Sequence, residues 1–77
     1  MEIAETLDTT GLLCPLPVLK LRKRLRGLSP GQVIALRADD PAALVDVPHF
    51  CAETGHELIN RRDEADGAQL YLVRKSG

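Results

Sequence analysis

Along the chain, the spacing of hydrophobic residues changes between that of helices and that of strands, and the order of these changes predicts the secondary-structure elements. From Cys14 to Gly27 the apolar side chains recur three or four positions apart, which is the spacing of one face of a helix. This stripe consists of Val18, Leu21, Leu25 and Leu28. Gly27 and the turn residues Ser29-Pro30-Gly31 then end the helix.

The next segment, residues 32–38, is a short β-rich run with three large aliphatic side chains. It predicts a largely buried strand that begins after the Pro30-Gly31 turn and stops at Asp39-Asp40-Pro41. Asp40 is well suited to cap the helix that follows, because a carboxylate accepts hydrogen bonds from free backbone N–H groups.

A second helical spacing runs through Leu44, Val47, Cys51 and Thr54, and Pro48 interrupts it. Because an interior proline breaks a backbone hydrogen bond, we expect a turn at 41–45 and the main helix from about Asp46 to Thr54, with Asp46 or Val47 near its cap. Gly55 suits the left-handed position after the helix.

Two strands of a hairpin are predicted at 57–64 and 68–75, joined at Ala65-Asp66-Gly67, with Leu70 and Leu72 on one face and Tyr71 and Val73 on the other. With an opening strand at 5–9, the order is β-α-β-α-β-β. This order predicts an α/β (α+β) fold, a two-layer sandwich in which two helices cover one face of a mixed four-stranded sheet. We expect one domain over residues 1–77.

The size and composition of the chain limit the chemistry that it can hold. A domain of 77 residues has a small core, because domains of about this size bury only about 60% of the surface of the unfolded chain. The two cysteines form neither a zinc-ligand cluster nor a disulfide framework, and His49 and His56 read as a surface and a cap-adjacent histidine, so we expect no metal. The N-terminus lacks the features of a signal peptide and no stretch approaches a membrane span, which predicts a cytoplasmic protein with reduced thiols.

Charge is polarised along the chain, although its net value is only −1. Five basic residues crowd the first helix, and acids dominate from Asp39 to Asp66. With one Phe, one Tyr and no glycine-rich phosphate loop, direct binding of nucleic acid is not expected. A membrane surface is also disfavoured, because the apolar stripe of the helix must cover the sheet.

The strongest chemical candidate is Cys14, which lies between a glycine turn and two prolines. If Cys14 is the N-cap, Pro15 is the first helical residue; the regular helix can instead begin at Pro17. In both cases the thiol lies near the positive end of the helix dipole, so we expect its pKa to fall below about 8.5. Cys51, on the apolar face of the second helix, reads as a core residue.

A cysteine beside a helix start is often structural, and Cys14 is weighed against that alternative. It falls off the apolar stripe and lies at a strand-to-helix turn, where functional side chains are often displayed. A hydrolase would need a base, an oxyanion hole and a cleft, for which this chain has little room. The thiol more plausibly reacts with the sulfur of another protein; the alternative is a non-catalytic interaction or regulatory module.

The segment LDTTGLLCPLP, residues 7–17, resembles the L-D-x-x-G-L-x-C-P-x-P signature of the TusA-type sulfur carriers, also grouped as SirA-like. The resemblance continues through 39–51, 55–58 and 71–75 and so covers nearly the whole chain. It implies that Cys14, within the motif formed with Pro15 and Pro17, accepts sulfane sulfur from a cysteine desulfurase or rhodanese. Cys14 would hold the sulfur as a persulfide, without any other cofactor, and pass it to an acceptor protein.

Relays of this family serve tRNA thiolation, molybdenum-cofactor biosynthesis or sulfur oxidation, and the sequence does not choose among them. At the variable motif position this chain has Leu16, whereas some tRNA-thiolation members carry an acidic residue there. The face of the first helix opposite its stripe carries Leu16, Leu19, Lys20 and Lys23. We expect this face to dock partners, with leucines buried and lysines steering an acidic rim; alternatively, a leucine tucks against the preceding loop and the lysines only solubilise.

Overall fold

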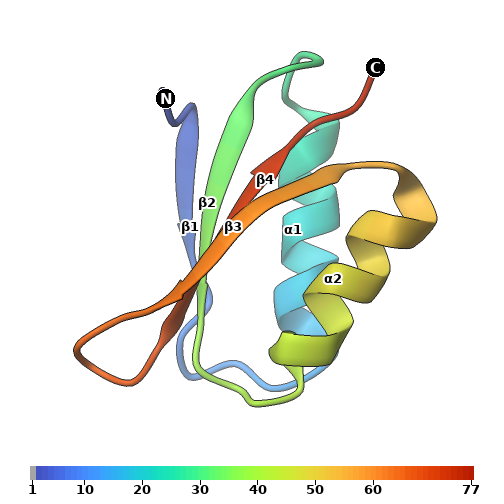
Figure 1. Ribbon diagram of the computed structural model, residues 1–77. Coiled ribbons are helices and arrows are strands. Elements are labelled where there is room, and N and C mark those ends of the chain that lie inside the picture. Colours follow the sequence, from blue (N-terminus) through green and yellow to red (C-terminus); the bar gives the residue numbers. More distant parts are fainter. Residues whose placement is uncertain (1) are drawn as a thin grey trace.

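The computed structural model describes residues 2–77 and shows a four-stranded sheet with both helices on one of its faces (Figure 1). The elements are β1 (Glu5–Asp8), α1 (Leu16–Arg26), β2 (Val33–Ala38), α2 (Ala43–Thr54), β3 (Glu57–Asp63) and β4 (Gln69–Arg74). The predicted order and the predicted two-layer α+β sandwich are therefore confirmed.

The sheet is mixed, with the strand order β1-β2-β4-β3. β1 pairs with β2 in parallel, and β4 pairs antiparallel with both β2 and β3. A parallel pair needs a crossover connection, and α1 supplies it. The register places Leu36 opposite both Leu7 and Tyr71, so these three side chains share the face that the helices cover.

The core lies between this face and the helices. Leu21 and Leu25 of α1 are buried, and Val18 and Leu28 pack at the edge, so the predicted stripe faces the sheet. Cys51 is 4% exposed and belongs to the core, as predicted. The complete buried cluster is Leu21, Leu25, Ile34, Leu36, Ala38, Ala43, Val47, Phe50, Cys51, Tyr71 and Val73.

The start of α2 differs from the prediction. The helix begins at Ala43, not near Asp46, and it contains Pro48. Asp40 makes this early start possible, because its carboxylate Oδ1 accepts the N–H of Ala42 at 3.1 Å and its backbone oxygen accepts the N–H of Ala43 at 2.9 Å. The N-cap of α2 is Ala42, so Asp40 is not the cap residue but supports the turn that leads into the helix. Within the helix, Pro48 removes one backbone hydrogen bond.

This correction also moves one apolar side chain. Leu44 was expected on the buried face of α2, but it is 41% exposed in the first turn. At the other end, Gly55 has φ 82°, the left-handed conformation that was predicted to end the helix.

The two helices run in the same direction, so the loops that lead into them lie together at one end of the molecule (Figure 1). These loops are residues 9–15, before α1, and 39–42, before α2. Within residues 2–77, no helix has the length and the apolar composition to cross a membrane.

Candidate functional site around Cys14

Cys14 is exposed in the loop between β1 and α1, two residues before the first helical residue. The helix begins at Leu16 with Pro15 in the N-cap position, between the two starts that the sequence suggested. The Cys14–Pro15 peptide bond is cis. Pro17 is buried, so the second proline of the motif packs inward while the thiol stays accessible.

Three carboxylates of the β2–α2 segment hold this loop. Asp39 Oδ1 accepts the N–H of Gly11 at 2.9 Å, and Asp40 Oδ2 accepts the N–H of Cys14 at 2.7 Å. The thiol of Cys14 itself donates to Asp46 Oδ2 at 2.8 Å. Asp46 lies in the first turn of α2. The sequence predicts Asp46 or Val47 near the cap of this helix, whereas the structure makes Asp46 the hydrogen-bond partner of the thiol.

These contacts overturn the expected thiolate activation. The pKa of Cys14 is raised, first because its thiol donates a hydrogen bond to Asp46, and further because of partial burial and the negative charges of Asp46 and Asp40. The pKa of Asp40 is lowered, since its charged form accepts backbone N–H groups from Cys14 and Ala42. Burial raises the pKa of Cys51 to about 11, which leaves this second cysteine unreactive.

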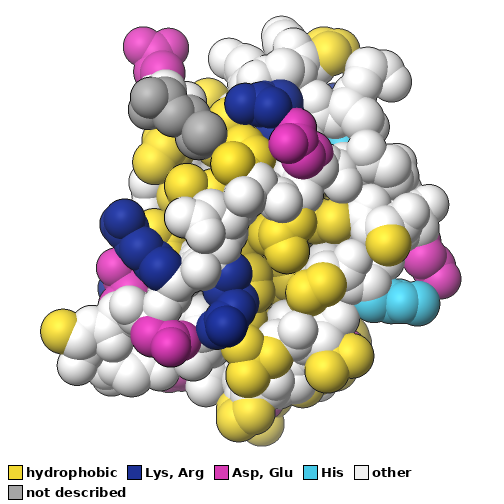
Figure 2. Space-filling view, viewed as in Figure 1, with side chains coloured by type: hydrophobic (Ala, Val, Ile, Leu, Met, Phe, Trp, Pro, Cys, Tyr) yellow, Lys and Arg dark blue, Asp and Glu magenta, His cyan; other side chains and the backbone are white. Residues whose placement is uncertain are grey.

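Exposed apolar side chains surround the thiol loop. Leu13 is 69% and Leu16 is 45% exposed, and Leu44 and Val45 of α2 are 41% and 70% exposed. We call these four residues the apolar rim. Figure 2 shows hydrophobic side chains gathered at the lower end of the molecule, where the loops before both helices lie. The sequence pattern indicated Leu16 but not the other three. Leu44 and Val45 were missed because α2 was expected to begin later, and Leu13 because it lies in the loop before α1, outside any periodic pattern.

The predicted docking face of α1 is exposed but points in a second direction. Leu16 and Leu19 are 45% and 49% exposed, so neither tucks against the preceding loop. Lys20 and Lys23 line a hollow with residues of β1. At the edge of this hollow, Arg24 Nε lies 3.2 Å from Glu5 Oε2. The lysines therefore border β1, whereas the apolar rim faces the end of the molecule.

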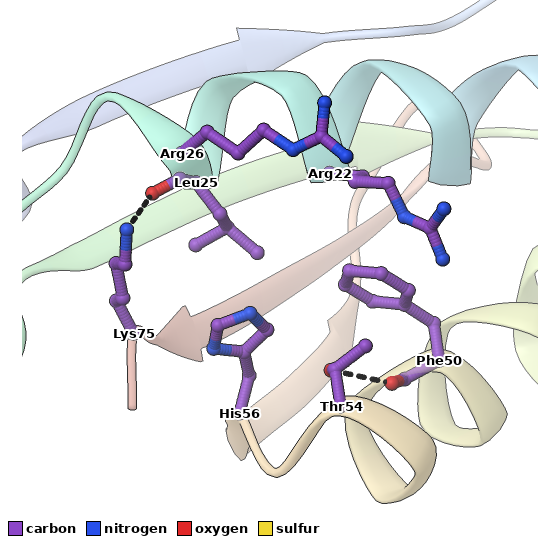
Figure 3. A pocket seen from close by; sticks show the side chains of 7 residues that line it. All are labelled: Arg22, Leu25, Arg26, Phe50, Thr54, His56 and Lys75. Atoms are coloured by element: carbon purple, nitrogen blue, oxygen red, sulfur yellow. Dashed lines mark hydrogen bonds between the residues drawn. The ribbon is translucent and has the colours of Figure 1, made fainter. Parts of the chain in front are cut away.

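A separate hollow of about 230 Å³ lies at the opposite end, where α1 and α2 terminate (Figure 3). Its lining is Arg22, Leu25, Arg26, Phe50, Thr54, His56 and Lys75. Lys75 Nζ donates to the backbone oxygen of Leu25 at 2.7 Å, and the Arg22 guanidinium carbon lies 5.7 Å from the centre of the Phe50 ring. Cations at helix C-termini offset the partial negative charge there, so these basic side chains have a structural explanation.

The two histidines lie where the sequence predicted. His49 is exposed and its Nε2 lies 2.9 Å from Glu53 Oε1, one helical turn away. His56 follows the cap of α2 and its ring packs 5.8 Å from that of Phe50. In the part of the chain that the structure describes, no three His, Cys, Asp or Glu side chains are grouped to hold a metal ion.

Comparison with known proteins shows the family and the fold to which this α+β sandwich belongs. The family described as Sulfurtransferase TusA matches residues 5–75. The sulfur carrier protein TusA of Pseudomonas entomophila is 49% identical over 70 residues, which cover 91% of this chain and 86% of that protein. The TusA of Pseudomonas aeruginosa strain PAO1 is 46% identical over 69 residues, with 90% and 86% covered.

A solved structure shows the same fold. The crystal structure of a SirA-like protein from Desulfitobacterium hafniense superposes with a TM-score of 0.84 at 20% identity, covering 95% of this chain and 99% of that one. The chain belongs to the TusA family of sulfurtransferases.

Proposed function

We propose that this protein is a sulfur carrier that holds sulfane sulfur as a persulfide on Cys14. The observation that carries the proposal is the contrast between the two cysteines of a TusA-family chain: Cys14 is exposed on the motif loop, and Cys51 is 4% exposed in the core. Nothing in the comparisons favours the alternative of a non-catalytic interaction or regulatory module.

The chemistry is an exchange between two proteins. Cys14 Sγ attacks the outer sulfur of a persulfide on the donor; a new S–S bond forms on Cys14, the S–S bond of the donor breaks, and the donor cysteine leaves with the electron pair. The proton that Cys14 loses is taken up by the donor thiolate. Unloading is the same exchange in the other direction, with an acceptor cysteine as the nucleophile.

The partners that fit this chemistry are a donor protein, such as a cysteine desulfurase or rhodanese, and an acceptor protein with a reactive cysteine. Neither of the two hollows described above is lined by Cys14. A partner must therefore supply the enclosure in which the exchange occurs. The cytoplasmic location and the absence of nucleic-acid binding remain predictions.

Docking would use two adjoining surfaces. The α1 face of Leu16, Leu19, Lys20 and Lys23 was expected from the sequence, and all four residues are exposed. The apolar rim adds Leu13, Leu44 and Val45 beside the thiol. Exposed apolar groups next to a reactive atom offer burial, and the lysines offer steering toward an acidic surface.

Substitution of each cysteine tests the assignment. Cys14→Ser should abolish the gain of labelled sulfane sulfur from a cysteine desulfurase supplied with cysteine, as seen by mass spectrometry of the intact protein. Cys51→Ala should retain the label and lose about 1 kcal/mol of unfolding free energy, because it truncates a core side chain. Labelling of Cys51 alone, or of both cysteines equally, would contradict the proposal.

A further inference from the structure

One carboxylate contacts the sulfur that the carrier uses. The Cys14 thiol donates to Asp46 Oδ2 at 2.8 Å, while the backbone N–H of the same residue is held by Asp40 at 2.7 Å. Cys14 is exposed and Asp46 is half-buried. Within residues 2–77, the charged groups that act on the thiol are these two carboxylates, and both come from the β2–α2 segment.

We propose that Asp46 is a positioning residue that latches the unloaded carrier in its neutral thiol form, and that a sulfur-exchanging protein opens the latch by placing a basic side chain against Asp46. The inference rests on the proposed function, since it concerns the same sulfur atom. It adds a feature of the partner: a lysine or arginine close to the sulfur that the partner donates or accepts.

The physical basis is the difference between thiol and thiolate. The thiolate is the nucleophile, and a thiol that donates a hydrogen bond to a carboxylate is stabilised in its neutral form. A free carrier with the latch closed therefore reacts slowly with small electrophiles and oxidants. This protects the sulfur from the irreversible steps of cysteine oxidation.

Docking of the partner protein would free the Cys14 thiol from Asp46. Leu13 directly precedes Cys14 in the chain, and Leu44 and Val45 directly precede Asp46. These side chains are exposed, so a partner that covers the apolar rim would also exclude water from around Asp46. Charge pairs are stronger where water is excluded, so a basic side chain of the partner would pair with Asp46 more favourably there than in the free protein. Asp46 then no longer opposes the thiolate, and Cys14 Sγ can attack the outer sulfur of the donor.

The first test measures the latch without any sulfur transfer. Asp46→Asn keeps the size of the side chain and removes its charge. Alkylation of Cys14 by iodoacetamide, followed across pH, should show a lower midpoint in this variant and a severalfold faster rate at pH 7. Glu53→Gln is the matched control, because Glu53 is an exposed carboxylate on the same helix, and it should behave as wild type. If Asp46→Asn does not fold, as judged by circular dichroism, Asp46→Ser replaces it.

The second test measures partner opening. In Asp46→Asn, the rate at which inorganic polysulfide loads Cys14 should rise severalfold. The rate of loading by a cysteine desulfurase with cysteine should not rise, because in the wild-type protein the docked desulfurase already releases the thiol from Asp46. A wild-type midpoint in the alkylation of Asp46→Asn would overturn the latch. Equal gains with both sulfur sources would overturn opening by a partner. The alkylation result tests the latch without any sulfur loading. If Cys14 of the wild-type protein takes up no sulfur from either source, the proposed function is contradicted, and the latch is still judged by alkylation.

Discussion

Among single residues, Asp40 forms hydrogen bonds with two segments of the chain that no sequence pattern connects. Its Oδ2 accepts the N–H of Cys14 and its Oδ1 accepts the N–H of Ala42, so one carboxylate ties the cysteine loop to the start of α2. These bonds favour the charged form and lower the pKa of Asp40. A carboxylate whose pKa is lower in the folded than in the unfolded state contributes stability above the unfolded value of about 3.9, and that stability is lost as pH falls through the folded value.

We therefore expect Asp40→Asn to be less stable than wild type at neutral pH and to lose less stability on acidification. Urea unfolding at pH 7 and at pH 3 measures both effects. Asp8 and Asp66 also have lowered pKa values, so part of the acid sensitivity should remain in the variant. Glu2→Gln, at an exposed position, is the control. An acid sensitivity of Asp40→Asn as large as that of wild type would show that Asp40 does not contribute.

The sequence predicted which cysteine is exposed and which is buried, but it did not predict the carboxylates that contact the thiol, for a physical reason. Whether a cysteine lies on or off an apolar stripe is a local property, and it separated Cys14 from Cys51. The pairing of Cys14 with Asp46 spans 32 positions and depends on how two loops meet after the helices pack. The sequence shows the helix dipole, which lowers the pKa of Cys14, but not the carboxylates that raise it. The predicted direction of the Cys14 pKa was therefore wrong.

Among the elements, α2 is the one whose bounds the sequence misplaced. Pro48 suggested a later start, because the hydrogen bond that a proline removes is visible in the sequence. The hydrogen bonds from Ala42 and Ala43 to Asp40, which support the turn before the helix, depend on the path of the preceding loop and are not visible there. The earlier start puts Leu44 and Val45 in the first turn of α2, so the misplaced boundary also concealed half of the apolar rim.

Replacing this proline should stabilise the helix. Pro48→Ala restores an N–H that can bond to the backbone oxygen of Leu44, and we expect about 1 kcal/mol more unfolding free energy, measured by urea denaturation. Ala52→Gly, at an exposed position of the same helix, is the control. It should lower the unfolding free energy by about 1 kcal/mol, which shows how strongly the stability of the protein depends on the helix propensity of α2. A loss of stability in Pro48→Ala would mean that packing of the proline ring outweighs the missing bond.

At the scale of the whole molecule, the predicted architecture is confirmed. The sequence could predict it because the helical spacing and the strand spacing of apolar residues follow one another in a clear order along the chain. A helix with one apolar stripe buries it against a sheet face, and here both helices use the same face (Figure 1). Their parallel course brings both leading loops to one end of the molecule and the C-terminal ends of both helices to the other, where the last turn of α1 is basic (Figure 1). The basic helix of the sequence thus divides its charges among several surfaces.

The lysines that border β1 should affect transfer between proteins and not the thiol itself. Lys20→Glu with Lys23→Glu should slow loading by a cysteine desulfurase and leave loading by inorganic polysulfide nearly unchanged, and the wild-type protein-to-protein rate should fall with added salt. Arg61→Glu with Arg62→Glu makes the same charge change on the exposed strand β3 and should have little effect. Wild-type loading of the lysine variant by the desulfurase at low salt would exclude this docking face.

The loop that carries the thiol and the segment that contacts it are separate pieces of the chain, held together by hydrogen bonds of Asp39, Asp40 and Asp46. A synthetic peptide of residues 11–27 would contain the whole Cys-Pro-x-Pro motif and none of these carboxylates. The smallest transplantable unit is therefore a pair of segments, residues 9–17 and 39–46, mounted at a fixed separation. A designer who grafts the motif alone onto another scaffold would obtain an ordinary surface cysteine.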